Sequence, residues 1–371
     1  MFRPSPYEAL QVLPPEEREL SGKERLLLAS GPLLSWYRRE KRDLPWRENR
    51  DPYRIWISEI MLQQTRVEAV KPYFFRFFEH FPRISDLASA PEEELLKCWE
   101  GLGYYNRVKN MKKCAQYCVK HYAGSLPNSY ELLKQLPGIG DYTAGAIASI
   151  AFHLPYPAVD GNVLRVFSRL LVSEDDILKE RTKKKFQNII KEYIPIERCD
   201  AFTQALMEIG ALICVPNAMP RCNICPLAED CIGYQSHQAQ RLPIKEKKKA
   251  RRIEKKTILV VVHQKEVLLQ QRAEDRLLAG LYEFITLDGE REEEEVMAFL
   301  GHERIHKIIK LRSAKHIFSH VEWHMQGYLL EVKEKLDGLW CTQQALEQQY
   351  AIPTAFKAYK DALYTWWRTQ E

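Results

Sequence analysis

Four closely spaced cysteines constrain the fold of this chain more than any other feature. They follow the pattern Cys214-x7-Cys222-x2-Cys225-x5-Cys231. The N-terminus lacks the apolar core of a secretion signal, so disulfides are not expected, and clustered cysteines then indicate a metal site. A structural zinc ion and a [4Fe–4S] cluster both accept four thiolates. Zinc sites tend to use two Cys-x2-Cys pairs and only one is present here, so the spacing favours the iron–sulfur cluster.

The composition is that of an ordinary folded protein. The 371 residues suggest two or three domains, at roughly 150 residues per domain. The chain is 45% hydrophobic, yet no apolar run approaches the roughly 20 residues that cross a bilayer. The net charge of +5 is mild, so the location of the charge matters more than its sum. The remaining cysteines are expected to be reduced and mostly buried: Cys98, Cys114, Cys118, Cys199 and Cys341.

Apolar periodicity predicts a helical domain at 22–235. Asp51 followed by Pro52 is a start signal for one of its helices. Apolar residues at three- and four-residue intervals predict an all-α domain around a cleft. The expected helices cover 24–40, 51–65, 67–80, 92–98, 107–121, 129–136, 142–153, 163–171, 181–192 and 200–213.

One segment before this helical domain and one after it show no clear apolar periodicity. Residues 1–21 are rich in proline and acid and are expected to form an N-terminal arm. Residues 236–256 read as a basic interdomain linker, since the 16 residues from Arg241 to Lys256 hold nine Lys or Arg. Such a segment is either a solvated tether or an additional contact for nucleic-acid phosphates.

Residues 257–371 change to a mixed pattern. Strand-like runs occur at 257–263, 266–271, 305–310 and 316–332, and helical patterns at 292–300 and 354–368. We therefore predict a separate α+β domain here.

A glycine-containing turn between two predicted helices is a candidate phosphate site. Within Leu136–Thr143, Gly138 and Gly140 allow a sharp turn that leaves amide groups open to an anion. Asp160 then precedes another predicted helix, whose N-terminus favours the ionised carboxylate. Such an aspartate is most simply a helix cap, but a carboxylate beside a cleft can also stabilise a developing sugar cation.

The glycine turn, Asp160 and the cysteine loop together resemble the helix–hairpin–helix DNA glycosylases of the endonuclease III superfamily. Three motifs narrow the resemblance to the MutY-type adenine DNA glycosylases: Leu44-Pro45-Trp46-Arg47, Ser58-Glu59-Ile60-Met61-Leu62-Gln63-Gln64-Thr65 and Gly101-Leu102-Gly103-Tyr104-Tyr105. Residues 257–371 are similar to the Nudix-like C-terminal domain of that family, through 280–284 and 318–320. The resemblance implies a mostly α glycosylase domain with a [4Fe–4S] loop at 214–231, followed by an α+β domain that recognises 8-oxoguanine.

The resemblance also implies a reaction. Members of this family flip adenine out of duplex DNA where it is paired with 8-oxoguanine or guanine, and hydrolyse its N-glycosidic bond. By resemblance, Glu59 is the general acid that protonates adenine at N7, and Asp160 stabilises the oxocarbenium-like sugar. Tyr142 and Asn162 are supporting groups. Bifunctional relatives carry a lysine at position 142 for a Schiff base, so the tyrosine predicts a monofunctional glycosylase.

Further motif residues become candidate contacts with the substrate. Gln64 and Tyr104 are expected to fill the duplex beside 8-oxoguanine, and Ser319 with His320 to read that base. The acidic run at 292–295 lacks the spacing of a magnesium-binding Nudix helix, so hydrolase activity is not expected. The full set of predicted substrate and DNA contacts is Trp46, Arg47, Leu62, Gln64, Tyr104, Gly138, Gly140, Gln204, Ser319 and His320.

Alternatives remain open from the sequence. One is an endonuclease III-like glycosylase and lyase for oxidised pyrimidines, and another is a non-catalytic protein that binds lesions. Seven residues separate Cys214 from Cys222, one more than in the family's usual loop, which leaves the loop's DNA contacts undetermined. We expect a monomer in the bacterial cytoplasm, associated with the nucleoid and not with a membrane. The linker is also a candidate contact for repair proteins or a replication clamp.

Overall fold

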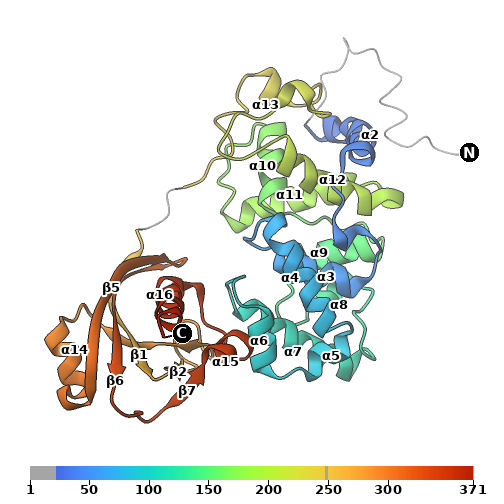
Figure 1. The fold of residues 1–371 in the computed structure, drawn as a ribbon. Coiled ribbons are helices and arrows are strands. Elements are labelled where there is room, and N and C mark those ends of the chain that lie inside the picture. Colours follow the sequence, from blue (N-terminus) through green and yellow to red (C-terminus); the bar gives the residue numbers. More distant parts are fainter. Residues whose placement is uncertain (1–21, 247–249, 371) are drawn as a thin grey trace, which may run out of the picture. The chain divides into compact units, whose positions relative to one another are not determined.

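The computed structural model describes residues 22–246 and 250–370, which form two compact units (Figure 1). Among the described residues, the first unit contains 22–88 and 113–246, and the second contains 89–112 and 250–370. The predicted arm at 1–21 and part of the predicted linker, 247–249, lie outside the described residues. Among the described helices, none combines the length and apolarity that crossing a bilayer requires.

The first unit is helical, as predicted. The helices α5 and α13 were not predicted, because a segment of six or four residues is too short to show a helical apolar repeat. Its helices are α2 (Gly22–Glu40), α3 (Pro52–Met61), α4 (Val67–His80), α5 (Ile84–Ser89), α7 (Asn106–His121, from Lys113 onward), α8 (Tyr130–Leu133), α9 (Asp141–Ala146), α10 (Gly161–Leu170), α11 (Glu180–Tyr193), α12 (Cys199–Leu212) and α13 (Ile232–Gln235).

Helix α3 begins as predicted, but eight of its ten residues are buried. The carboxylate of Asp51 accepts a hydrogen bond from the amide of Tyr53 at 2.9 Å, and Pro52 occupies the first helical position. The three- and four-residue intervals between apolar residues predict one buried face for this helix. That prediction was incomplete, because Ser58 and Glu59 are buried as well. The helix also ends at Met61, before the predicted Thr65.

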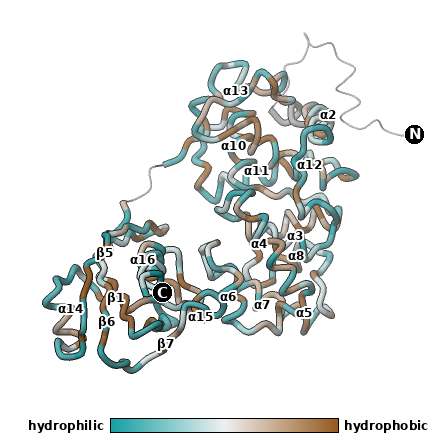
Figure 2. The backbone as a smooth tube through the Cα atoms, viewed as in Figure 1, coloured by the Kyte–Doolittle hydropathy of each residue, from teal (hydrophilic) through white to brown (hydrophobic). Residues whose placement is uncertain are grey.

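Helices α10 and α12 approach closely in the hydrophobic core of the first unit. Hydrophobic and hydrophilic stretches alternate along these helices (Figure 2), and their apolar residues join those of α2 and α11 in one core. A Cβ atom added to Gly210 on α12 would lie 2.6 Å from the Cβ of Asn162 on α10, so only glycine permits this approach. The contact fixes the position of Asn162.

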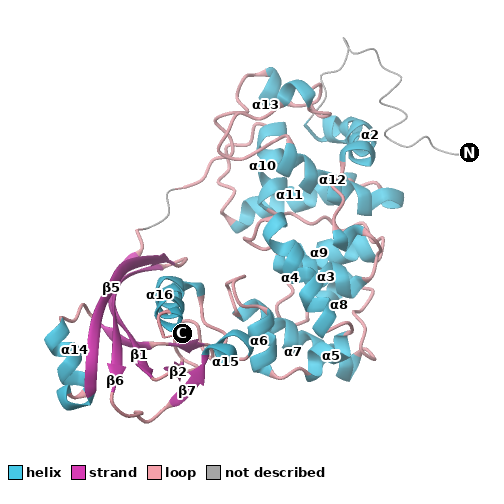
Figure 3. Ribbon diagram, viewed as in Figure 1, coloured by secondary structure: helices cyan, strands magenta, loops and turns pink. Residues whose placement is uncertain are grey.

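The second unit is built on a mixed sheet, which confirms the predicted α+β class (Figure 3). Its strand order is β3-β2-β1-β6-β5, with β4 paired to β1 and β7 paired to β2; β1 and β6 are parallel. Residues of α16 pack on one face and residues of α14 on the other. The elements are α6 (Glu92–Cys98), β1 (Arg252–His263), β2 (Glu266–Gln271), β3 (Tyr282–Glu283), β4 (Ile285–Asp288), α14 (Glu293–Leu300), β5 (Ile305–Ile317), β6 (Val321–Val332), β7 (Leu339–Thr342), α15 (Gln343–Gln348) and α16 (Lys357–Arg368).

Two strand boundaries differ from the prediction. Strand β1 begins at Arg252 and not at 257, because 252–256 pair with β6 despite their charge. The predicted run 316–332 is two strands, since a turn at 318–320 separates β5 from β6. In this turn the amide of Phe318 donates to the carbonyl oxygen of Val321 at 2.9 Å. Ser319 and His320 therefore lie at the tip of a hairpin.

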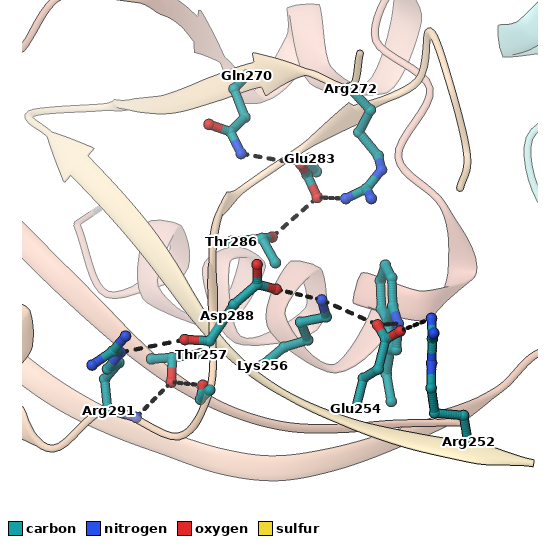
Figure 4. A network of polar contacts seen from close by, with 12 residues as sticks. Arg252, Glu254, Lys256, Thr257, Gln270, Arg272, Glu283, Thr286, Asp288 and Arg291 are labelled. Atoms are coloured by element: carbon teal, nitrogen blue, oxygen red, sulfur yellow. Dashed lines mark hydrogen bonds and ion pairs between the residues drawn. The ribbon is translucent and has the colours of Figure 1, made fainter. Parts of the chain in front are cut away.

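A polar network ties the strands of the second unit together (Figure 4). The guanidinium of Arg272 pairs with the buried carboxylate of Glu283, which also accepts a hydrogen bond from the Thr286 hydroxyl at 3.0 Å. Lys256 lies between Glu254 and Asp288, at 3.1 and 2.5 Å. These charges neutralise one another within the fold.

Candidate active site

One cavity in the first unit brings together eight of the predicted site residues. The cavity measures about 170 Å³, and its walls come from α3, the segment before it, α9, the start of α10, and α12. The predicted residues in its lining are Trp46, Arg47, Glu59, Leu62, Tyr142, Asp160, Asn162 and Gln204. Residues from five separate parts of the chain thus surround one space.

The environment of Glu59 favours its protonated form. Its side chain is 6% exposed, and the phenol of Tyr142 donates a hydrogen bond to Oε2. Burial raises the pKa of Glu59 to about 7; the charge of Asp160 adds to this rise, whereas the Tyr142 hydrogen bond and Arg47 oppose it. Burial also raises the pKa of Tyr142, so the phenol remains a donor. Glu59 is therefore a carboxyl group that carries a proton near neutral pH.

Asp160 caps α10 and faces the same cavity. Its Oδ1 accepts a hydrogen bond from the amide of Val163 at 2.8 Å, and its Oδ2 accepts one from Nδ2 of Asn162 at 2.7 Å. We expected the helix N-terminus to favour the ionised form, but burial raises the pKa of Asp160 and outweighs the hydrogen bonds that lower it. The charge of Asp160 also raises the pKa of Glu59, so the two carboxyl groups form an interacting pair.

The sequence did not identify two further residues in the cavity wall, Arg42 and Glu208. The carboxylate of Glu208 accepts hydrogen bonds from Arg42 and Arg47, each at 2.8 Å, and is almost fully buried. Burial alone would raise the pKa of Glu208, but the two arginines lower it to about 2. Glu208 lies one helical turn after Gln204, on the same face of α12, and that spacing was the signal that could have revealed it.

A second, more open cavity carries the glycine turn. Gly138, Gly140 and Gln64 line it together with Lys183 and Gln187 of α11, which were not predicted. Of the two glycines, only Gly138 has left-handed backbone, at a φ of +77°. The sequence assigned the sharp turn to both glycines, but Gly140 is extended, at a φ of −95°, and caps α9.

The two cavities of the first unit share lining residues. Leu62, Tyr142 and Asp160 contribute to both of them. The open cavity beside the glycine turn therefore lies next to the cavity that Glu59 and Asp160 line.

The second unit holds the remaining predicted contacts with DNA. Tyr104, Ser319 and His320 line one cavity there. The phenol oxygen of Tyr104 lies 3.4 Å from Oγ of Ser319. Tyr104 is 48% exposed and has a φ of +49°, a conformation that costs a residue with a side chain free energy and is often found at functional sites.

The four clustered cysteines line one cavity beside α10 and α12. Burial raises the pKa of Cys225 to about 12 and that of Cys231 to about 11, and neighbouring thiolates add to the rise. Four thiolates in such a place need a cationic partner, so the donor set fits a metal cofactor. The Arg169 guanidinium already donates to Sγ of Cys214 at 3.2 Å. Within 22–246 and 250–370, no three or more His, Cys, Asp or Glu side chains converge on a single ion.

The loop between Cys214 and Cys222 is closed by a backbone hydrogen bond. Asn217 has left-handed backbone, at a φ of +55°, and the amide of Arg221 closes the loop on the carbonyl oxygen of Ile213 at 3.0 Å. The two cysteines therefore remain at the base of a bulged loop.

Arg165 connects the cysteine loop to Asp160. Its Nη2 donates to Oδ1 of Asn162 at 2.9 Å, and its Nε donates to the carbonyl oxygen of Cys214 at 2.7 Å. Asn162 in turn donates to Asp160. The orientation of the carboxylate thus depends on the segment that carries Cys214.

Both domains match known families. Residues 57–192 match the HhH-GPD superfamily base excision DNA repair proteins, and residues 257–362 match the NUDIX domain. Among solved structures, a thermostable thymine-DNA glycosylase has a TM-score of 0.50 at 28% identity and covers 57% of this chain and 97% of its own. An endonuclease III bound to DNA has a TM-score of 0.50 at 25% identity and covers 58% of this chain and 97% of its own.

The sequence relatives extend over both domains. The adenine DNA glycosylase of Buchnera aphidicola subsp. Acyrthosiphon pisum is 36% identical over 303 residues, which are 81% of this chain and 85% of the relative. That of Homo sapiens is 32% identical over 396 residues, covering 88% of this chain and 72% of the relative. The chain therefore belongs to the MutY-type adenine DNA glycosylases, base-excision-repair enzymes that hydrolyse the N-glycosyl bond of adenine.

Proposed function

We propose that this enzyme excises adenine paired with 8-oxoguanine, or with guanine, from duplex DNA, and that it acts on a flipped-out base as a monofunctional glycosylase. The observation that carries the proposal is the pair of carboxyl groups, Glu59 and Asp160, in one cavity. A cavity needs about 10–15 Å³ to hold one water molecule, and this cavity of about 170 Å³ has roughly ten times that volume. This is the scale of a nucleobase.

Glu59 is the proton donor in this proposal. Adenine is a poor leaving group until a ring nitrogen is protonated, and a general acid works best when its pKa lies near the working pH. A carboxyl group with a pKa of about 7 meets that condition. Its proton passes to N7 of adenine, the bond between C1′ and N9 breaks, and the bonding electrons leave with the base.

Asp160 stabilises the sugar cation that remains. Its carboxylate is held in one orientation by Asn162 and by the amide of Val163, so little reorganisation is needed when positive charge develops at C1′. Water then adds to C1′ and loses a proton to the Glu59 carboxylate, which restores the acid, and the product is an abasic site.

Replacing Tyr142 with phenylalanine is expected to move the alkaline limb of the pH–rate profile to higher pH. The Tyr142 hydrogen bond lowers the pKa of Glu59, so its removal raises that pKa above about 7 and Glu59 stays protonated at higher pH. Single-turnover excision rates between about pH 5 and 10 give the pH at which the rate has fallen to half of its maximum. That pH can be compared between the two proteins even if the maximum rate itself is lower in the variant. A limb that stays in place or moves to lower pH would contradict this role.

The reaction class is tested on a duplex labelled on its adenine strand, with 8-oxoguanine opposite. Half of each sample receives hot alkali, which breaks the strand at abasic sites. We expect breakage only after alkali, because the phenol of Tyr142 cannot form a Schiff base. Breakage without alkali would support a lyase, and no breakage under either condition would support a non-catalytic lesion binder; either result contradicts the proposal.

We also propose that Cys214, Cys222, Cys225 and Cys231 hold a [4Fe–4S] cluster. In such a cluster each cysteine binds a different iron atom, which suits thiols that surround one cavity. The cluster would hold the loop 214–231 in place, and hydrogen bonds to its sulfur ligands, such as that from Arg169, tune its properties.

The protein purified from an iron-replete culture is expected to be brown. It should absorb at about 400 nm and contain about four iron atoms per chain. Elemental analysis that finds one zinc atom per chain and no iron would rule the cluster out.

Tyr104, Ser319 and His320 are the residues proposed to contact the base opposite adenine. Their support is the cavity they share and the 3.4 Å approach of Tyr104 to Ser319. A planar side chain can stack where a base pair has been opened. The open cavity beside the glycine turn, with Lys183 in its wall, is proposed to bind the phosphates of the substrate strand.

A further inference from the structure

The segment that carries Tyr104 is fixed by its own hydrogen bonds. Nη2 of Arg107 donates to the carbonyl oxygens of Leu102 and Gly103, both at 3.1 Å, and the indole of Trp99 donates to the latter at 3.0 Å. Tyr104 keeps its left-handed backbone conformation within this segment. The conformation of 101–105 is therefore set by local hydrogen bonds, and its position is set by the contacts of the residues that flank it.

Glu100 anchors the N-terminal end of that segment to the C-terminal part of the chain. Its Oε1 accepts hydrogen bonds from Nζ of Lys360 at 2.9 Å and from the amide of Ile352 at 3.2 Å. Its Oε2 accepts one from Nζ of Lys97 at 2.6 Å. Each oxygen of the carboxylate thus has a cationic donor, and one also binds a backbone amide.

Lys97 extends the same anchor to α15. Besides Glu100, its ammonium donates to the carbonyl oxygens of Leu346 at 2.9 Å and Tyr350 at 3.0 Å. Leu346 lies in the last turn of α15, where unpaired carbonyl groups and the helix dipole favour a cation.

The anchor is more than a surface ion pair. The side chains of Lys97, Glu100 and Lys360 are 16%, 19% and 21% exposed, whereas isolated pairs on the surface contribute little because water screens them. Here three largely enclosed charges, two from 97–100 and one from α16, share hydrogen bonds with backbone groups of 346–352. Such networks favour one arrangement of the parts over others.

We propose that Glu100 and Lys360 are positioning residues for recognition of the base opposite adenine. Together they set the placement of 101–105, and so hold Tyr104 against Ser319 without contacting DNA themselves. The inference rests on the proposed function of that cavity, and it assigns discrimination between 8-oxoguanine and guanine to a contact outside the cavity.

The test compares Glu100→Gln, Lys360→Met and the double variant with the parent protein, all as full-length chains. Glutamine keeps the size of the side chain but places an amide group against an ammonium group, and methionine keeps the stem of the lysine without its charge. Glu68→Gln is the control, since it breaks an exposed i,i+3 pair with Lys71 at 2.9 Å on α4. The readout is the ratio of kcat/KM for adenine opposite 8-oxoguanine to that for adenine opposite guanine.

Each single variant is expected to lower this ratio by about five- to twentyfold, and the double variant no further than the worse single variant, because both break one contact. The single-turnover rate for the adenine:8-oxoguanine duplex at saturating enzyme should change less than threefold. A variant that folded poorly would lose this rate as well. Ratios within twofold of the parent, or additive losses in the double variant, would overturn the inference. A parent protein that does not excise adenine would instead refute the proposed function.

Discussion

Replacing Glu59 with glutamine is expected to lower the single-turnover rate of adenine excision by about 10³-fold, within the range for loss of a general acid. Glutamine has nearly the same volume, and its amide oxygen can still accept the hydrogen bond from Tyr142. What it lacks is a proton to give at neutral pH. The cavity should therefore remain intact while the leaving group stays unprotonated.

The measurement for Glu59 pairs the rate with duplex affinity. Affinity for an adenine:8-oxoguanine duplex should stay within about threefold of the parent, because the loss lies in the transition state. The variant should also lose the alkaline limb that reports a pKa of about 7 in the parent. Glu48→Gln, at a side chain that is 62% exposed, serves as the control. A Glu59→Gln protein with more than a third of the parental rate would exclude Glu59 as the acid.

Asp160→Asn is expected to lower excision by about 10²–10³-fold, the loss that follows removal of one preorganised electrostatic stabiliser. Asparagine is as good a helix cap as aspartate, so the amide of Val163 keeps its partner and α10 should stay folded. The negative charge opposite C1′ is lost, however, and the sugar cation is left without its counterion.

Two comparisons separate chemistry from folding in the Asp160 variant. Asp51→Asn changes another capping aspartate, at the start of α3 and away from the cavity, and should leave the rate unchanged. Thermal denaturation should place the melting temperature of Asp160→Asn within a few degrees of the parent, since most substitutions that spare the core change stability modestly. If both capping variants lost activity equally, the effect of Asp160 would be structural.

The sequence predicted those features that depend on neighbouring residues. The cap at Asp51 with Pro52, the left-handed turn at Gly138 and the presence of the four cysteines around one cavity each follow from local geometry or from spacing. The division into a helical and a mixed part follows from the change in apolar period, since periodicity is a property of short stretches of chain.

Features that depend on distant contacts were missed or only partly predicted. Glu208 pairs with Arg42 from 166 positions away. Its spacing from Gln204 indicates the face of α12 on which Glu208 lies, but it does not indicate Arg42 as the partner. The burial of eight of the ten residues of α3 was not predicted, because a stripe of apolar residues shows one buried face and not how many neighbours surround the helix. For the same reason the pKa of Glu59 follows from its surroundings in the folded chain and not from its motif.

The most direct test of the central claim is a crystal structure of Asp160→Asn bound to a duplex that contains adenine opposite 8-oxoguanine. The loss of turnover should allow the substrate to survive. We expect the adenine outside the helical stack, within the cavity bounded by Trp46 and Gln204, with N7 at hydrogen-bonding distance from Glu59. An adenine that lies in the cavity with N7 turned away from Glu59, or that binds at another site, would contradict the claim.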